Sequence, residues 1–148
     1  MTLWGWAEQT WDRPGVGAAC LSLQDDHEQC VPLLLWALWR SETGGMDLNS
    51  AECAVAMCRS MDSAVIAPLR TARRNAPLQD RERLLVNELK AERELLDRLE
   101  ILSTSGERSR RSAAVDLAEI SALWGRPLDP AAFFPLIDAI AACEPVDV

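Results

Sequence analysis

The most constraining feature of this chain is an unbroken apolar run, VPLLLWALW, at residues 31–39. The run is much shorter than the roughly 20 apolar residues that a helix needs to cross a bilayer, and charged residues flank it on both sides. A helix that is apolar on nearly all faces is stable in water only when other elements surround it. We therefore expect residues 31–41 to form a central helix that the rest of a soluble fold buries.

The remaining sequence also has helical character. Of its 148 residues, 49% are hydrophobic and 26% are charged, which is the usage of one globular domain and not of a disordered chain. No segment shows the sustained alternation of a strand, and the middle of the chain is rich in Ala, Leu, Glu and Arg. The sequence predicts an all-α, single-domain bundle of about six to seven helices around the buried one.

Two long amphipathic patterns follow each other in the middle of the chain. The first begins at Asn49 or Ser50 and is bent or interrupted by Pro68; its apolar stripe consists of Ala54, Met57, Cys58, Met61, Val65, Leu69 and Ala72. The second occupies residues 78–103, and its stripe consists of Leu85, Leu89, Leu96 and Leu99. Because Pro77 separates the two patterns, we expect a long antiparallel helical hairpin.

The chain divides into three parts at a polar segment. Residues 1–103 are expected to form the helical core with its hairpin, and residues 104–112 a polar, basic linker. Residues 113–148 contain two short amphipathic helices, the second opened by Asp129 and Pro130. This C-terminal pair either closes the bundle or docks on a partner.

Six tryptophans are a high number for a chain of this length. Near the N-terminus, helical spacing from an N-cap at Thr2 places on the core-facing stripe Leu3, Trp4, Ala7 and Trp11. Trp6 lies off this stripe, so we expect it to be exposed. Trp36 and Trp39 lie in the central run, where they either fill the core or line an apolar pocket or a binding patch.

Charge and cysteine content argue against several functions. A formal net charge of −8 disfavours nucleic-acid binding, which depends on a positive field. Five cysteines at irregular spacing, without a C-x-x-C pair, indicate neither a disulfide framework nor a zinc site. We expect free thiols, with Cys53 and Cys58 the nearest in sequence for a reactive pair. The start of the chain lacks the features of a signal peptide, which favours a cytoplasmic protein.

One acidic cluster adjoins a histidine, in the segment QDDHEQ. Carboxylates and imidazole can bind metals or transfer protons. However, four consecutive residues do not converge on one point, and the chain has a single histidine. We therefore expect the end of a helix with acidic caps, no metal site and no catalytic residue. Asp25 and His27 remain candidates for polar contacts with a ligand or partner.

Arg70, Arg73 and Arg74 gather at the end of the first long pattern. Cations in the last turn of a helix offset the negative end of its dipole. The fork geometry of arginine also suits the capture of an anion or a phosphate. Both interpretations remain open. No phosphate-binding loop and no sequence motif of a known enzyme class is present, and no cofactor is expected.

The first half of the chain resembles an uncharacterised proteobacterial family of small proteins of unknown function. Its pattern is an aromatic-rich first helix followed by R-P-G-V, C-L-x-L-Q-D-x-H-G, V-N-x-L-L-F-x-x-W and P-L-R-x-x-R-R. The resemblance implies an all-helical cytoplasmic protein and supplies no activity. The matching residues include Gln24, Asp25, His27, Arg70, Arg73 and Arg74.

The chain departs from the family pattern at three positions. Glu28 stands where the family tends to have Gly, Cys30 where it tends to have Asp, and Pro32 where it tends to have Asn. A polar site at the start of the central helix, if relatives have one, is lost or changed in this protein.

These features favour a non-enzymatic helical interaction or regulatory protein that binds another protein or itself. The surfaces we expect it to use are the arginine-rich helix end, the 78–103 helix and the C-terminal helices. The alternative is a small-molecule protein, or an enzyme, that holds an anionic amphiphile in an apolar pocket beside Trp36 and Trp39. In that alternative the arginines form the rim of the pocket, and Asp25 or His27 is the polar partner.

Overall fold

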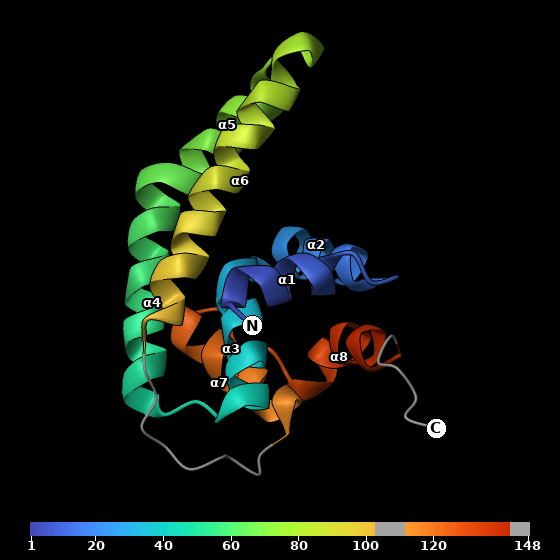
Figure 1. Ribbon diagram of the computed structural model, residues 1–148, viewed down its shortest axis with the longest axis vertical. Coiled ribbons are helices and arrows are strands. Elements are labelled where there is room, and N and C mark those ends of the chain that lie inside the picture. Colours follow the sequence, from blue (N-terminus) through green and yellow to red (C-terminus); the bar gives the residue numbers. More distant parts are fainter. Residues whose placement is uncertain (103–111, 143–148) are drawn as a thin grey trace.

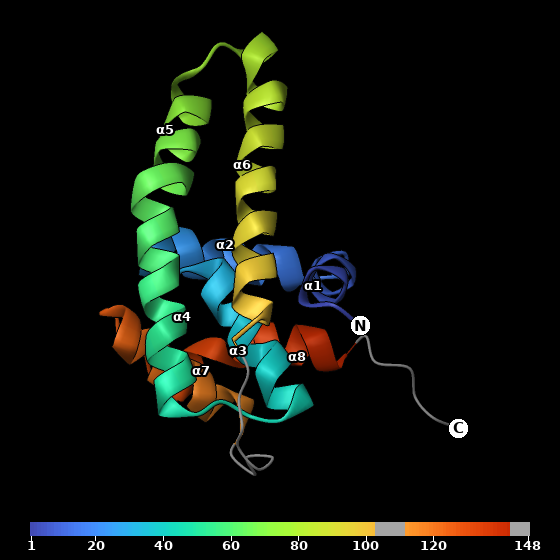
Figure 2. The same cartoon turned by 60° about the vertical axis from the view of Figure 1, so that its left-hand side comes forward.

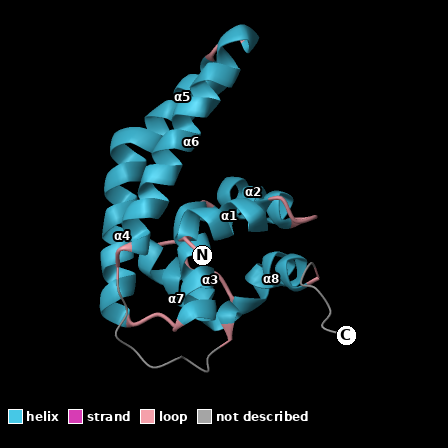
Figure 3. Cartoon of the chain, viewed as in Figure 1, coloured by secondary structure: helices cyan, strands magenta, loops and turns pink. Residues whose placement is uncertain are grey.

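A computed structural model describes residues 1–102 and 112–142, and helices dominate them (Figures 1 and 3). No strand occurs in this part of the chain, so the predicted all-α single domain is confirmed. In chain order the elements are α1 (Leu3–Trp11), α2 (Val16–His27), α3 (Val31–Thr43), α4 (Leu48–Met61), η1 (Asp62–Ile66), α5 (Ala67–Asn75), α6 (Leu78–Glu100), α7 (Ala113–Trp124), η2 (Pro130–Phe133) and α8 (Phe134–Ala141).

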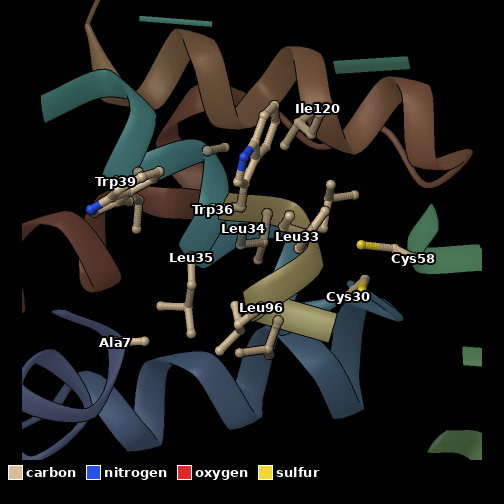
Figure 4. Packing of buried hydrophobic residues seen from close by; sticks show 14 of the residues in the cluster. Ala7, Cys30, Leu33, Leu34, Leu35, Trp36, Trp39, Cys58, Leu96 and Ile120 are labelled. Atoms are coloured by element: carbon tan, nitrogen blue, oxygen red, sulfur yellow. The ribbon is translucent and has the colours of Figure 1, made fainter. Parts of the chain in front are cut away.

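The central helix is α3, as its composition predicts. Every residue from Val31 to Trp39 is buried, and the exposed fraction of Trp36 is 0%. Helices α1, α2, α4, α6 and α7 all contact α3. Figure 4 shows Leu35 directed toward Ala7 of α1, and Trp36 beside Ile120 of α7. The apolar run is therefore covered by its own chain. No helix in residues 1–102 and 112–142 is long and apolar enough to span a bilayer.

The orientation of α1 differs from the prediction. Its buried face consists of Leu3, Trp6, Ala7 and Thr10, whereas Trp11 is 38% exposed and Trp4 is half-buried. Trp6 is 9% exposed, so the expectation that it faces solvent is wrong. Its indole N–H donates to Glu42 Oε2 at 3.1 Å, which lets a polar atom enter the core at low cost.

One helix start depends on a glycine, and another differs from the prediction. Helix α2 begins after Gly15, whose φ of +83° is a left-handed conformation that favours glycine. Helix α4 is capped by Asp47, which accepts from the backbone N–H of Ser50 at 2.7 Å, and not by Asn49 or Ser50.

Pro68 interrupts the first long helix as expected, and it does so through the π-helical turn η1. The Ala67 N–H bonds to the Asp62 carbonyl five residues earlier, which widens the turn just before the proline ring. A π-helical turn contains one residue more than an α-helical turn, so the side chains that follow are shifted around the helix axis. The position that faces the core therefore moves from residue 65 to residue 66. Ile66 is consequently 2% exposed and Val65 is 40% exposed, although the uninterrupted pattern had placed Val65 on the core face.

The predicted hairpin is present, with α4, η1 and α5 running antiparallel to α6 (Figure 2). Its lower half packs on the body, where α1 lies against α6 and Leu96 and Leu99 are buried. Its upper half, residues 67–90, projects beyond the body in both views, and we call it the arm (Figures 1 and 2). Leu85 and Leu89 are exposed there, contrary to the predicted continuous core stripe, because no element covers them within the described residues.

The C-terminal helices lie on the core. Helix α7 contacts both α3 and α4, and α8 contacts α2. The side chains of Phe133 and Leu136 are fully buried. Of the expected linker at 104–112, only Ser112 belongs to the described residues, where it caps α7. Cys143 lies outside them.

The buried thiol of Cys20 predicts a specific loss of stability at alkaline pH. Burial raises the pKa of Cys20 from 9.0 to about 12. Below pH 9 the thiol is protonated in both the folded and the unfolded chain, so its contribution to the free energy of unfolding is fully present. Between these two pKa values only the unfolded chain ionises, so the free energy of unfolding falls by up to about 1.4 kcal/mol per pH unit. Urea unfolding on either side of pH 9 should show a shallower fall for Cys20→Ala. Equal slopes for both proteins would rule out this contribution.

Candidate functional site

The predicted arginine cluster is divided between structural and surface roles. Arg70 and Arg73 of α5 both point to Glu88 of α6. Arg70 Nε donates to Glu88 Oε1 at 3.2 Å, and Arg73 Nε donates to Glu88 Oε2 at 2.6 Å. Glu88 is only 4% exposed. The carboxylate therefore joins the two helices of the arm at its centre.

A second carboxylate extends this network. Glu92 Oε1 lies 3.7 Å from Arg70 Nη2. Burial, and next the charge of Glu88, raise the pKa of Glu92, while the two arginines oppose this shift. The hydrogen bond to Glu88 raises the pKa of Arg73, so its guanidinium stays charged. The cluster is thus more than a helix-end cap, because two of its arginines are committed to a buried acid.

Sequence reasoning missed Glu88, although a signal for it exists. The face of α6 that packs on α4 and α5 includes Leu84, Ala91 and Leu95, and Glu88 occupies the position between Leu84 and Ala91 at helical spacing. An acid in an apolar row predicts a basic partner on the facing helix, because a buried charge must be paired. The arginine-rich α5 is that facing helix.

Arg74 makes a different contact. Its Nη2 lies 3.3 Å from Asp25 Oδ1 of α2, and both side chains are more than half exposed. Two motifs separated in sequence thus meet at the surface. An exposed pair of this kind stabilises a fold by only about 0–1 kcal/mol. Asp25 and Arg74 therefore remain available for other partners.

A cavity of about 410 Å³ lies at the base of the arm. The end of α2, the start of α3, the turn η1 with α5, and the end of α7 all contribute to its wall. Its polar residues are Gln24, Glu28, Gln29, Asp62, Arg70 and Arg126, and the others are Cys30, Val31, Pro32, Ile66 and Trp124. It brings together Gln24 and Arg70, which belong to the two separate motifs of the family pattern.

A second hollow adjoins the first on the outer side of α2. It is lined by Asp25, His27 and Glu28 together with residues 125–128, and it is open to solvent. Glu28 lines both. Its φ of +54° is left-handed, a conformation that glycine adopts without steric cost. Asp25 and His27 thus lie beside the cavity and do not line it.

Side-chain hydrogen bonds to backbone carbonyls and one ion pair hold the wall between the two hollows. Gln29 Nε2 donates to the carbonyls of His27 at 3.2 Å and Arg126 at 2.8 Å. The Trp124 indole N–H donates to the Glu28 carbonyl at 3.0 Å. Arg126 Nη2 lies 2.8 Å from Glu28 Oε2. Sequence reasoning did not single out Gln29, Trp124 or Arg126 for this site, because they meet only in the folded chain.

The two hollows do not lie beside Trp36 and Trp39, where the sequence predicts a pocket. Trp36 is enclosed in the core, and the ring of Trp39 packs against Arg40, whose guanidinium carbon lies 5.5 Å from the ring centroid. Neither indole lines the cavity or the outer hollow. Trp124 lines the cavity instead, and the guanidinium carbon of Arg59 lies 5.6 Å from its ring centroid. The aromatic wall of the cavity therefore comes from α7 and not from α3.

The nearest cysteine neighbours in sequence do not pair. Cys53 is exposed, while Cys58 is buried and hydrogen-bonded to Cys30 across α3 and α4 (Figure 4). This hydrogen bond and burial raise the pKa of the Cys58 thiol, which lowers its reactivity. Among residues 1–102 and 112–142, no group of three or more His, Cys, Asp or Glu side chains is arranged to hold a metal ion.

The fold and this site define a small all-helical protein with a projecting helical arm and a polar cavity at its base. A family model described as "Protein of unknown function (DUF2390)" matches residues 2–99. The chain therefore belongs to this family, which confirms the expected membership of an uncharacterised family. Comparison with curated proteins and with solved structures gave no match. The family match includes Gln29, Arg70 and Glu88 and ends before Trp124 and Arg126.

Proposed function

We propose that this protein is a helical interaction protein that associates with a second copy of itself through the arm. The observation that carries the proposal is the row of large apolar side chains on the outer part of α6. Leu78 is 80% exposed, Leu85 40%, Val86 53% and Leu89 46%. We call these four residues the apolar arm face. Large apolar groups that gather in this way are typical of a binding surface.

The apolar arm face is a continuation of the core stripe. At about 100° per residue, its four residues fall within roughly 100° of the circumference of α6, in line with Leu96. Leu96 is buried in the body, where α1 lies against α6. A second copy would cover Leu85 and Leu89 as α1 covers Leu96, and removal of this apolar surface from water would favour association.

The charges beside the apolar arm face support a second copy as the partner. Glu82 and Lys90 lie four residues before and four residues after Val86, and all three side chains are exposed. If two α6 helices pack antiparallel about a twofold axis at Val86, Glu82 of each copy lies level with Lys90 of the other. A twofold interface requires this kind of self-complementarity.

The two helices of the arm are also held together before any partner binds. Glu88 ties α5 to α6 through Arg70 and Arg73, and at about 100° per residue it lies roughly 110° around α6 from the middle of the apolar arm face. A helix pair that is ordered before association loses less conformational entropy when it binds. The proposal places the protein in the cytoplasm, a reducing compartment that suits the free thiols of Cys20, Cys30, Cys53 and Cys58.

Substitution of the apolar arm face should abolish self-association. Sedimentation equilibrium is expected to give twice the 16.4 kDa chain mass for the wild type and the single chain mass for Leu85→Lys with Leu89→Lys. Four lysines would then face each other across the interface, so the dissociation constant should rise at least about hundredfold. The matched control is Leu21→Lys, since Leu21 is 47% exposed on α2, and it should stay dimeric.

A charge exchange tests the geometry of the interface. Glu82→Lys alone should weaken the dimer, and Glu82→Lys with Lys90→Glu should restore it, because the opposite charges face each other again. A wild-type protein that is monomeric at all concentrations would contradict the proposal. Stable binding of a different protein to the apolar arm face would replace the second copy as the partner.

A further inference from the structure

Two of the cysteines face each other where α3 begins beside α4. Cys30 immediately precedes α3, and Cys58 lies in the last turn of α4. The two thiols are hydrogen-bonded, and Figure 4 shows the sulfur of Cys58 directed toward Cys30. Cys30 is 9% exposed and Cys58 is fully buried. A disulfide requires two cysteines whose side chains point toward each other, and this pair meets that requirement.

The backbone around Cys30 allows the adjustment that a covalent bond needs. Cys30 lies in the short connection between α2 and α3, its backbone is extended, and its side chain makes no capping hydrogen bond. A rotation of this side chain therefore leaves the start of α3 unchanged. Cys58 is fixed within the helical ladder of α4. A disulfide between them would place the small shift on the connection and not on the two helices.

The two thiols differ in access and in ionisation. Cys30 lines the cavity at the base of the arm, and Cys58 is not among its lining residues. The cavity of about 410 Å³ holds molecules little larger than water, such as hydrogen peroxide. The hydrogen bond to Cys30, and next burial, raise the pKa of the Cys58 thiol, so Cys58 keeps its proton. Because the thiolate is the nucleophile, Cys30 is the thiol that reacts first.

We propose that Cys30 and Cys58 are a reversible oxidation site, at which hydrogen peroxide forms a disulfide between α3 and α4. The Cys30 thiolate attacks one peroxide oxygen, so an S–O bond forms and the O–O bond breaks. The departing hydroxide takes up the proton that Cys30 released and leaves as water, and Cys30 becomes a sulfenic acid. The Cys58 sulfur then attacks the Cys30 sulfur, so the S–S bond forms and the S–O bond breaks. The leaving hydroxide takes the Cys58 proton as a second water, and the two thiols have lost two electrons to one peroxide.

The other described cysteines do not compete for this reaction. Cys20 is fully buried in α2, and burial raises its pKa to about 12, so its thiolate is scarce. Cys53 is exposed, but it lies five residues before Cys58 and therefore about 140° away around α4. Disulfides in a reducing compartment are typically transient and respond to oxidants, which suits a pair that is reduced at rest.

The disulfide should make the fold more resistant to heat. It closes the loop from residue 30 to residue 58 and joins the start of the central helix to the lower part of the hairpin. Closure of such a loop restricts the unfolded chain, so the midpoint of thermal unfolding should rise by about 5–15 °C. Dithiothreitol should reverse this rise.

Peroxide treatment of the full chain tests the proposal. The variant Cys53→Ser with Cys143→Ser leaves only Cys20, Cys30 and Cys58 as thiols. After exposure to hydrogen peroxide, unfolding and alkylation, mass spectrometry should find one alkylated thiol per chain and a link between Cys30 and Cys58. Dithiothreitol before alkylation should restore all three thiols. The same treatment in concentrated urea is the matched control, and it should give mixed links that include Cys20, because the fold no longer selects the pair.

Two single substitutions test the order of the steps. In Cys58→Ala the oxidised Cys30 lacks its partner, so its sulfenic acid should persist and react with dimedone. In Cys30→Ala, Cys58 should remain unlabelled. Labelling of Cys58 without labelling of Cys30 would overturn the assigned order. The mapping of links needs neither substitution, so it keeps the proposal testable if one of them unfolds the chain.

Three further results would overturn the proposal. They are the survival of all three thiols in the folded protein, links to Cys20 as frequent as in urea, and a fall in the midpoint of thermal unfolding after oxidation. The last result would mean that the bond forms only when the fold is distorted. The test is independent of self-association, because Leu85→Lys with Leu89→Lys should form the same disulfide.

Discussion

Replacement of Trp36 by alanine is expected to lower the free energy of unfolding by about 3–5 kcal/mol. Trp36 is the largest side chain with an exposed fraction of 0%, and it lies where α3 meets α7 (Figure 4). Its removal would leave a void that the surrounding helices fill only in part. Denaturant unfolding followed by circular dichroism measures the change, and Trp11→Ala is the control. Trp11 is 38% exposed, so its loss should cost less than about 1 kcal/mol.

The conservative change at the same position separates packing from polarity. The indole N–H of Trp36 is buried without an acceptor in the described residues. Trp36→Phe removes this donor, which favours folding, and it also leaves a void, although a smaller one than Trp36→Ala leaves. These two effects on the free energy of unfolding oppose each other. We expect a net cost of no more than about 1.5 kcal/mol. If Trp36→Ala were as stable as the wild type, α3 would not be the centre of the core.

The second large effect is expected at Glu88. Glu88→Gln removes the shared negative charge between Arg70 and Arg73, which lie 3.2 and 2.6 Å away. Loss of one partner of a buried ion pair costs about 3–5 kcal/mol. The arginine side chains are 18% and 29% exposed, so water screens part of the loss and the lower end of this range is expected.

A matched control for Glu88 exists on the same helix. Glu94 pairs with Arg98 at 2.6 Å, but both side chains are more than half exposed. Glu94→Gln should therefore change the free energy of unfolding by less than about 1 kcal/mol. Equal effects of the two substitutions would show that burial of Glu88 does not strengthen the pair, and would remove the reason to regard the arm as braced.

The sequence predicts those parts of the fold that depend on composition. The run at 31–39 has no polar face, so it must be buried however the neighbouring helices are arranged. Pro68 lacks an N–H, so an interruption near it is required. The orientation of α1 does not follow in this way. Tryptophans occur on several of its faces, and which of them is buried depends on how α1 packs against α2, α3 and α6, where Glu42 of α3 accepts from the Trp6 indole.

The candidate site was predictable to a smaller extent. Arg70 and the segment before α3 were recognised from motifs, but their place on one cavity depends on the turn η1, which shifts the face of the helix by one residue. Gln29 and Arg126 are separated by 97 residues and meet only through tertiary packing. The exposure of Leu85 and Leu89 depends on where the body ends along α6, which periodicity alone does not specify.

Amide hydrogen exchange of α6 at increasing protein concentration tests the central claim most directly. The claim is that the protein's own helices bury α3, while a second copy covers the apolar arm face. The account predicts that amides of residues 78–90 become more protected as concentration rises, whereas those of α3 are strongly protected at every concentration. Exchange in 78–90 that is rapid and independent of concentration would contradict it.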